Sequence, residues 1–119
     1  MNMQFHAHGQ HVILDLYGIN HAQLTDPELI ESMMLNVANE LNATVLQSHL
    51  HHFGRDLGVT GVLLLAESHM SIHTWPEAGF AAIDIFMCGD KDMNQAIQLF
   101  IQAFAPTQHD VKIIQRGKP

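Results

Sequence analysis

The sequence predicts an α+β fold, a two-layer α/β sandwich with a mainly antiparallel sheet and two helices on one face. Two segments have apolar residues at helical spacing, and short apolar runs bounded by glycine, proline or polar residues lie before, between and after them. Two helices are too few to cover both faces of the sheet that these runs would form. Several runs carry apolar residues at both odd and even positions, which favours a second subunit as the cover of the other face. We therefore expect a dimer.

Five segments are expected to be strands because each is short, mostly apolar and bounded by breakers. They are residues 11–19, 43–53, 59–65, 80–87 and 110–115. Residues 54–58 form a glycine-bounded turn between the second and third strands, so these two strands should pair as a hairpin. Residues 1–10 are expected to be a loose lead-in, and residues 20–25 a connection.

Both expected helices have clear end signals. In the first, Asp26 suits the N-cap and Pro27 the first turn, and Asn42 follows the last apolar position as a stop. In the second, Asp92 caps the start and Pro106 prevents continuation. Apolar residues spaced three and four apart give each helix one buried side. These residues are Leu29, Ile30, Met33, Met34, Val37, Ala38 and Leu41 in the first helix, and Met93, Ala96, Ile97, Leu99, Phe100, Ala103 and Phe104 in the second.

Size and composition exclude several classes of protein. With 119 residues, the chain is expected to form one domain, residues 1–119. A formal charge of −7 with only five lysines and arginines argues against binding to nucleic acid, whose phosphates need clustered cations. The apolar runs are far shorter than the ~20 residues that cross a bilayer, and residues 1–6 do not have the pattern of a signal peptide. The single cysteine, Cys88, excludes an internal disulfide. We expect a soluble cytoplasmic protein.

Residues 66–77 gather reactive side chains in one short stretch. They include two serines, a threonine, two histidines, two glutamates and the only tryptophan. The stretch follows the apolar run 62–65 and reaches a break at Pro76, so we expect an accessible loop held by a buried strand. Ser68 has His69 beside it and is either a loop-capping residue or a nucleophile activated by a nearby base. No Gly-x-Ser-x-Gly elbow surrounds Ser68, which argues against an ordinary serine hydrolase.

The segment 67–77, with the sequence ESHMSIHTWPE, resembles the self-processing segment of the bacterial and archaeal S-adenosylmethionine decarboxylases. The resemblance extends, in order, over nearly the whole chain. Its other parts are residues 9–12, 51–53, 58–62, 79–84 and 88–89. Because the central motif is long and unusual, the chain is identified as similar to the prokaryotic-type, pyruvoyl-dependent proenzymes.

The resemblance implies that the chain makes its own cofactor, a pyruvoyl group, from Ser68. The Ser68 hydroxyl would attack the carbonyl of Glu67 and turn the peptide into an ester, and β-elimination would then split the chain. The product chains would be residues 1–67 and residues 68–119, the second beginning with the pyruvoyl group. His73 matches the family histidine assigned to the elimination, a task for a base that suits imidazole near neutral pH. Thr60 stands where many members have a serine whose hydroxyl assists processing.

The resemblance also implies the reaction. The pyruvoyl ketone would form a Schiff base with the α-amine of S-adenosylmethionine and accept the electrons left when CO2 departs. The product would be decarboxylated S-adenosylmethionine, the aminopropyl donor for spermidine synthesis. Cys88 matches the family's proton donor, Phe53 the aromatic that stacks on adenine, and Glu77 the carboxylate that binds the ribose hydroxyls. The resemblance brings no metal to this site, and it implies a homo-oligomer, expected to be a dimer, whose subunits share the active site.

One alternative keeps the chemistry and changes the substrate. Relatives on this scaffold decarboxylate a free basic amino acid such as arginine or ornithine, which needs a carboxylate for the distal cation and no platform for adenine. Phe53 and Glu77 favour the nucleoside substrate. His52, Ala78 and Phe80 depart from residues that are frequent in the family, and these departures bear on the shape of the pocket.

Two further alternatives change the class of protein. Ten histidines suggest a metal-binding protein, in which His49 and His51 share one face of a strand and His69 and His73 lie near Ser68. Neither a Cys-x-x-Cys nor a His-Glu-x-x-His pattern supports that function. The other alternative is a non-catalytic interaction protein, and it predicts that the chain stays whole.

Overall fold

The computed structural model describes residues 7–118 as a six-stranded sheet with three α-helices. The strands are β1 (His8–Tyr17), β2 (Val45–His52), β3 (Val59–Leu65), β4 (Ser68–Trp75), β5 (Phe80–Cys88) and β6 (Gln108–Gly117). The helices are α1 (His21–Leu24), α2 (Pro27–Glu40) and α3 (Met93–Phe104), and a 3₁₀ turn, η1, spans Pro76–Ala78. Residues 1–6, part of the expected lead-in, lie outside the described residues. No helix within residues 7–118 has the length and apolar character needed to span a membrane.

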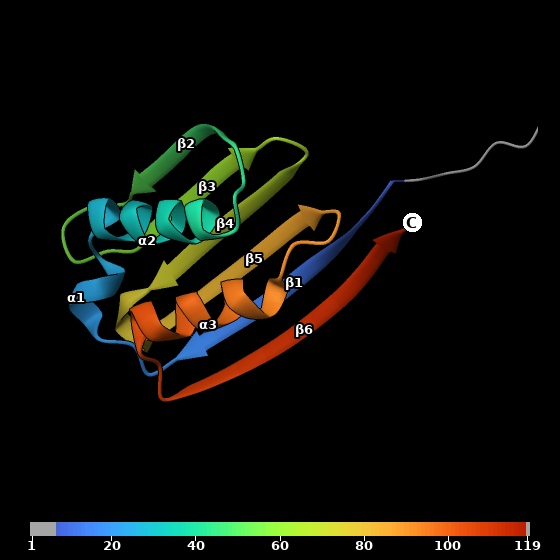
Figure 1. Ribbon diagram of the computed structural model, residues 1–119. Helices are drawn as coiled ribbons and strands as arrows, with labels where there is room; N and C mark the ends of the chain where they lie inside the picture. Colours follow the sequence, from blue (N-terminus) through green and yellow to red (C-terminus); the bar gives the residue numbers. More distant parts are fainter. Residues whose placement is uncertain (1–6, 119) are drawn as a thin grey trace, which may run out of the picture.

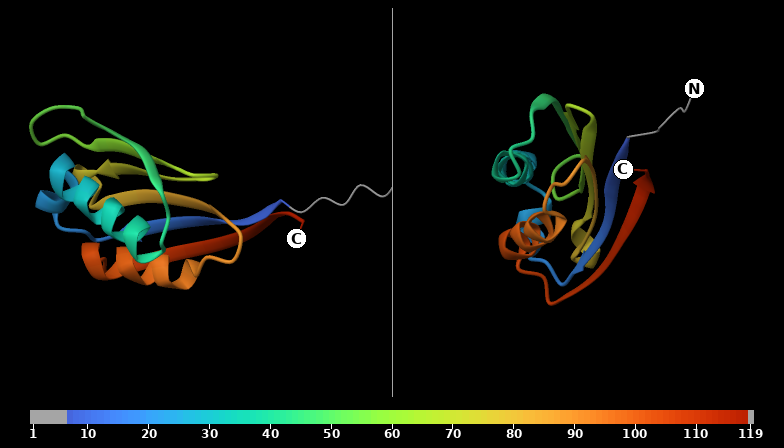
Figure 2. Two further views of the ribbon diagram at one scale, coloured as in Figure 1. Left: turned by 45° about the horizontal axis from the view of Figure 1, so that its top comes forward. Right: turned by 45° about the vertical axis from the view of Figure 1, so that its right-hand side comes forward.

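Neighbouring strands of the sheet are antiparallel throughout, in the order β2-β3-β4-β5-β1-β6 (Figure 1). The helices α2 and α3 lie side by side against one face of the sheet (Figure 2). The predicted α+β class, the antiparallel sheet and the two main helices on one face are therefore confirmed. The hairpin expected before residue 66 is also confirmed, because β2 pairs with β3.

The stretch that was expected to be an accessible loop is instead strand β4, so the sheet has six strands rather than five. The polar residues of β4 alternate with Met70, Ile72 and Thr74, which are buried. Alternation with a period of two is the pattern of a strand buried on one side. Only Ala66 and Glu67 are left as the turn between β3 and β4. The reactive residues thus stand on a rigid strand.

The two predicted helices begin where their caps predict. The Asp26 carboxylate accepts two backbone hydrogen bonds of 3.1 Å at the start of α2, and Asp92 accepts one of 3.1 Å at the start of α3. The expected connection before α2 contains the short helix α1. Its last residue is tied to the sheet, because the buried Thr74 hydroxyl donates to the Leu24 carbonyl at 2.7 Å and accepts from the Val59 N–H at 2.8 Å.

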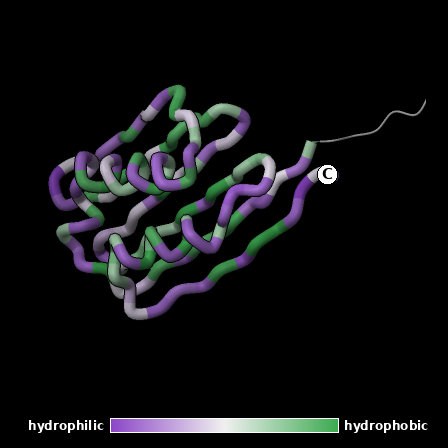
Figure 3. Tube along the Cα trace, viewed as in Figure 1, coloured by the Kyte–Doolittle hydropathy of each residue, from purple (hydrophilic) through white to green (hydrophobic). Residues whose placement is uncertain are grey.

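The core fills the space between the helices and the sheet. Hydrophobic and hydrophilic residues are interspersed along the strands (Figure 3). Buried residues alternate with less buried ones in β5, and the buried apolar residues of the sheet form one core cluster with those of α2 and α3. Phe100 and Phe104 of α3 are almost fully buried and stack with their ring centroids 6.5 Å apart. Each buried side chain of this kind contributes about 1.5–3 kcal/mol relative to an exposed one. This packing fixes the sheet and, with it, the residues on its other face.

The face of the sheet that turns away from α2 and α3 is called the open face below. Residues paired directly across antiparallel strands share a face, so the register identifies its members. They include Gly9, His11 and Ile13 of β1, Thr60 and Leu64 of β3, His69, Ser71, His73 and Trp75 of β4, Asp84, Phe86 and Cys88 of β5, and Ile114 and Arg116 of β6. Among the described residues, no helix covers this face. Ile13, Leu64 and Ile114 are 39%, 41% and 45% exposed on it, and exposed apolar area of this kind usually marks contact with another protein.

Candidate active site

The expected cleavage point lies in the turn between β3 and β4. Leu65 and Ser68 face each other across the hairpin, so the Glu67 carbonyl belongs to the turn and Ser68 begins the next strand. Glu67 has φ of 62°, in the left-handed region that residues other than glycine seldom adopt. Such a backbone conformation costs of order 1–3 kcal/mol. Strain is therefore stored at the residue whose carbonyl Ser68 is expected to attack.

Cys88, at the end of β5, contacts both reacting groups of this bond. Its thiol donates a hydrogen bond to the Glu67 carbonyl oxygen at 2.9 Å. Its backbone N–H donates to the Ser68 hydroxyl oxygen at 3.2 Å. A donor on a carbonyl oxygen draws electron density from the carbonyl carbon and stabilises negative charge that develops on the oxygen. The arrangement thus favours nucleophilic attack at the Glu67 carbonyl.

A pocket of about 400 Å³ opens beside the bond. It is lined by Ala7, His8, Glu67, Cys88 and Gly89. The His8 ring lies 3.5 Å from the Asp90 carboxylate, and the Gly89 N–H donates to the His8 carbonyl at 3.1 Å. The start of β1 and the end of β5 therefore form the walls of a space beside Glu67 and Cys88.

A second pocket, of about 340 Å³, lies at the other end of β4. Its lining residues are Phe53, Leu57, Gly58, Thr60, His73, Thr74, Trp75 and Glu77. The Thr60 hydroxyl and His73 Nδ1 are hydrogen-bonded at 3.0 Å. The four residues predicted for processing or substrate binding outside the cleavage turn, Phe53, Thr60, His73 and Glu77, are thus gathered here. The hydrogen bond between Thr60 and His73 orients the imidazole ring.

Trp75 lines this pocket as well, although the sequence suggested no role for it. The side chain is 41% exposed and its ring stacks on Phe80 at 5.2 Å, which in turn stacks on Tyr17 at 5.1 Å. Trp75 and Phe53, the predicted adenine-binding aromatic, line the same pocket, and the only sequence signal for Trp75 was that it is the single tryptophan. The stack keeps one ring face fixed in place at the edge of the pocket.

The two pockets are separated by most of the length of β4. Ser68 is its first residue, and His73 follows five residues later. At about 3.3 Å per residue along a strand, the Cα atoms of Ser68 and His73 lie about 16 Å apart. The structure therefore brings Ser68, Glu67 and Cys88 together and brings His73 together with Thr60, but it does not bring His73 to Ser68 within one chain. Each of the two sets has a member on the open face, namely Cys88 in the first and His73 in the second.

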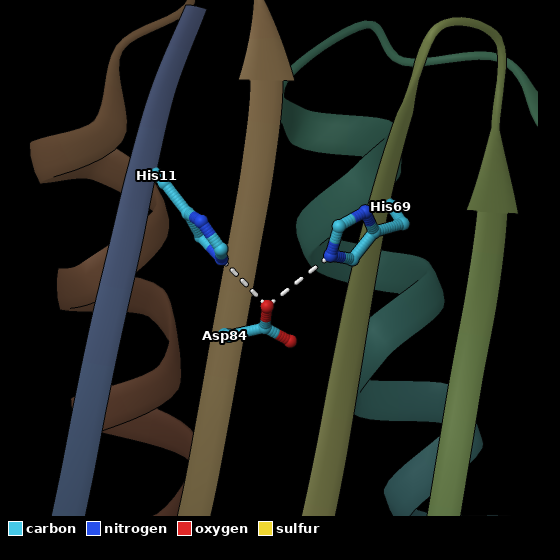
Figure 4. A group of neighbouring side chains, drawn as sticks. All are labelled: His11, His69 and Asp84. Carbon is cyan, nitrogen blue, oxygen red and sulfur yellow. Dashed lines mark hydrogen bonds and ion pairs between the residues drawn. The ribbon is translucent and has the colours of Figure 1, made fainter. Parts of the chain in front are cut away.

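A third cluster occupies the middle of the open face, where His11, His69 and Asp84 come together from three neighbouring strands (Figure 4). Asp84 Oδ2 lies 2.7 Å from His11 Nε2 and 3.2 Å from His69 Nε2. Ser71 donates to the other carboxylate oxygen. Burial alone would raise the pKa of Asp84, but the hydrogen bonds from Ser71, His11 and His69 outweigh it and hold the pKa below its ordinary value.

This cluster differs from the histidine set that the metal-binding alternative invoked. His69 points to Asp84 rather than to His73, and His49 hydrogen-bonds Gln47 on its own strand at 2.9 Å. Within the described part of the chain, the one group of three metal-ligand side chains is His11, His69 and Asp84. Sequence reasoning missed His11 and Asp84 because strand β4 was not expected, and only that strand places His69 between β5 and β3.

Comparison with known proteins gives consistent matches over the length of the chain. Residues 10–117 match the family model described as S-adenosylmethionine decarboxylase. The S-adenosylmethionine decarboxylase proenzyme of Prochlorococcus marinus (strain MIT 9313) is 46% identical over 93% of this chain and 89% of the relative. The proenzyme of the same name from Sulfurihydrogenibium sp. (strain YO3AOP1) is 41% identical over 92% of this chain and 82% of the relative.

A solved structure gives the same result for the fold. The crystal structure of the adenosylmethionine decarboxylase from Aquifex aeolicus superposes with a TM-score of 0.86 at 36% sequence identity. The superposition covers 93% of this chain and 92% of that one.

Proposed function

This chain belongs to the S-adenosylmethionine decarboxylase family, and from that premise we propose that it decarboxylates S-adenosylmethionine after cutting its own backbone before Ser68. The family predicted from residues 67–77 is confirmed by the match over residues 10–117 and by relatives that are 46% and 41% identical. Those relatives are named proenzymes, which is consistent with self-processing. They do not favour the arginine, ornithine, metal-binding or non-catalytic alternatives.

The first step of processing is supported by the contacts of the turn. Ser68 Oγ attacks the Glu67 carbonyl carbon, and the oxyanion that forms lies against the Cys88 thiol, now 2.9 Å from the carbonyl oxygen. The bond from that carbon to the Ser68 nitrogen then breaks, and the nitrogen takes up a proton. The product is an ester between Glu67 and the Ser68 oxygen. Release of the left-handed conformation of Glu67 favours this step.

The second step needs a base at the α-carbon of residue 68. The base removes the α-proton, the ester oxygen leaves with the Glu67 carboxylate, and a dehydroalanine remains. Water converts the dehydroalanine into a pyruvoyl group with loss of ammonia. We assign the base to His73, whose ring is oriented by the Thr60 hydroxyl at 3.0 Å.

Because His73 lies about 16 Å along β4 from Ser68, we assign it to the neighbouring subunit. Two copies packed with their open faces together, around a two-fold axis lying between the sheets and across the strands, place the start of β4 in one copy over its end in the other. Cys88 of one protomer, with the Ser68 hydroxyl beside its backbone N–H, then faces the partner's His73 and Thr60. The exposed apolar residues of the open face give such a dimer its buried area.

The fold keeps the two product chains together. Residues 1–67 contribute β1, β2 and β3, and residues 68–119 contribute β4, β5 and β6. In the strand order β2-β3-β4-β5-β1-β6, β3 of the first product pairs with β4 of the second, and β1 of the first lies between β5 and β6 of the second. Cleavage in the turn breaks none of the pairings between β3 and β4, which run from Leu65 and Ser68 onward. The new chain end therefore stays in the sheet beside Cys88.

The site fits a pyruvoyl group, because the neighbours of residue 68, Glu67 and Cys88, line a pocket and the Cys88 thiol lies against the bond that is cut. The group supplies an electrophilic carbonyl that accepts electrons as the substrate loses CO2. We assign to the Cys88 thiol the return of a proton to the α-carbon. Once the Glu67 carbonyl has left, this thiol has no other partner among the described residues and is directed at residue 68.

The second pocket provides the nucleoside subsite. Phe53 is 58% exposed and offers a ring face for adenine, and Glu77 accepts hydrogen bonds from the ribose hydroxyls. In the proposed dimer this pocket belongs to the same active site as the pyruvoyl group of the other chain. The sulfonium of the substrate is a cation. It is compatible with a chain of formal charge −7 and with cation–π attraction to the nearby aromatic rings.

The observation that carries the proposal is the contact of Cys88 with both Glu67 and Ser68 in a chain of this family. The test is an assay of purified protein with carboxyl-labelled S-adenosylmethionine, arginine and ornithine. We expect labelled CO2 from S-adenosylmethionine only. Release from arginine or ornithine at a higher kcat/KM would assign the chain to the basic amino acids. Absence of release from all three substrates in fully cleaved protein would overturn the enzymatic function.

A further inference from the structure

The cluster of His11, His69 and Asp84 has no part in the proposed reaction. It lies in the middle of the open face, between the cleavage turn at one end of β4 and the nucleoside pocket at the other. Two imidazoles and one carboxylate, each from a different strand, converge on one point (Figure 4). Two histidines with one carboxylate form a donor set that proteins use repeatedly for divalent transition metals.

The spacing of the donor atoms suits a metal ion. His11 Nε2 and His69 Nε2 lie 2.7 and 3.2 Å from Asp84 Oδ2, and all three atoms lie within 4.8 Å of one another. Ligands of a tetrahedral zinc at about 2.0–2.1 Å are about 3.3 Å apart. Side-chain rotations that move the donor atoms by about 1.5 Å or less therefore suffice, with the strands left where they are.

The contacts around the cluster also orient its donor atoms for binding a cation. The Nε2 atoms of both imidazoles point to the same oxygen of Asp84. One ion bound between them would take the place of the hydrogen bonds that now join these three atoms. Ser71 holds the other oxygen of Asp84 and fixes the direction of the carboxylate, as residues behind metal ligands commonly do. In the single chain the side chains of His11, His69 and Asp84 are 20%, 38% and 28% exposed, so an ion can enter from the open face before two copies pack together over it.

We propose that His11, His69 and Asp84 form a binding site for one divalent transition-metal ion per chain, with zinc the best fit to the donors. Three protein ligands leave a fourth position for water. The site joins the central strands β1, β4 and β5. In the processed protein, His11 belongs to the product of residues 1–67 and the other two ligands belong to the product of residues 68–119. The ion would therefore cross-link the two product chains one residue away from the new chain end.

The test uses untagged protein, because a histidine tag binds the same metals. Chelator-treated protein is dialysed against zinc or cobalt(II) alone, and bound metal is measured by mass spectrometry of the elements. We expect one zinc per chain in the wild type and the visible absorption bands of tetrahedral cobalt(II) in the cobalt form. His11→Gln, His69→Gln and Asp84→Asn should each lose the bound metal. Ser71→Ala should weaken binding by about 10–100-fold, because Ser71 only orients a ligand.

The matched control is His49→Gln, an exposed histidine on the same face but outside the cluster. It should retain one zinc per chain. Ser68→Ala protein should also retain it, which separates this proposal from the cleavage reaction. The proposal is overturned if wild-type protein takes up no stoichiometric metal and develops no cobalt bands, since the cluster is then a hydrogen-bonded network only. It is equally overturned if the three ligand variants bind as much metal as His49→Gln.

Discussion

The Cys88 thiol lies 2.9 Å from the carbonyl oxygen of Glu67, across a sequence separation of 21 residues. The contact arises from the register of the sheet. Phe86 pairs with His69, so the end of β5 falls beside the turn that precedes β4. The residue assigned to proton transfer in the finished enzyme therefore already touches the bond that is cut to make the cofactor. One side chain serves both reactions in the proposed mechanism.

Cys88→Ala tests the double role of this residue. Loss of a hydrogen bond to a developing charge, worth about 1.5–3 kcal/mol, should slow cleavage by about 10- to 100-fold. Turnover of the cleaved protein should fall by about 10²–10⁴-fold, because a general acid is removed. Fragment formation on denaturing gels and labelled CO2 release measure the two effects separately. Cys88→Ser retains a donor and should cleave faster than Cys88→Ala; equal cleavage by all three proteins would contradict the role in processing.

Glu67→Gly tests the strain in the turn. Glycine adopts a φ of 62° without the steric cost that glutamate meets there. In a Ser68→Ala background, which stays uncleaved, the substitution should raise Tm by about 2–5 °C. The control is Ala66→Gly in the same background, since Ala66 is not among the residues with positive φ and should lose stability. A fall in Tm for Glu67→Gly, of the size seen for Ala66→Gly, would rule out stored strain at residue 67.

The shared active site can be tested by complementation. Ser68→Ala and His73→Ala are each expected to give no cleavage when expressed alone. When the two are co-expressed, a mixed dimer has one site with both wild-type residues, so the His73→Ala chain should be cut by the partner's His73. Random pairing predicts roughly a quarter of the wild-type number of sites. If co-expression yields no fragments although mixed dimers are isolated, His73 does not act across the interface.

Phe53 and Glu77 should affect substrate binding without affecting cleavage. Loss of base stacking costs about 1–3 kcal/mol, so Phe53→Ala should raise KM for S-adenosylmethionine by roughly 5- to 150-fold. Glu77→Gln should raise KM because an amide accepts fewer hydrogen bonds from the ribose diol than a carboxylate. Steady-state kinetics on fully cleaved protein provides the measurement. The assignment fails if both variants keep the wild-type KM, or if the loss appears only in fragment formation.

The sequence predicted the fold class because the helix signals are local. The start of α2 is predicted by Asp26 and Pro27 and its length by the spacing of its apolar residues. None of these signals depends on a distant part of the chain. Strand β4 was predicted as a loop because its outer residues, His69, Ser71 and His73, are polar and reactive. These residues alternate with Met70, Ile72 and Thr74, which are buried. A half-buried strand with a polar outer face has this pattern.

The site was predictable only in part, for a related reason. The resemblance predicted roles for Glu67, Ser68 and Cys88, but their contacts depend on the register between β4 and β5, which no local signal encodes. Because residues 68–75 form an extended strand, Ser68 and His73 are far apart. A loop over the same residues would have allowed the two side chains to meet. His11 and Asp84 lie far from His69 in the chain, so strand order alone brings them together.

The most direct measurement is the intact mass of freshly purified wild-type protein, followed during incubation and compared with Ser68→Ala. We expect the wild type to give two species, residues 1–67 and residues 68–119, the second with a terminal ketone that reacts with hydroxylamine. Ser68→Ala should remain a single species of full length. A wild-type protein that also stays at full length after long incubation, with no ketone-bearing fragment, would contradict the cleavage at Glu67–Ser68.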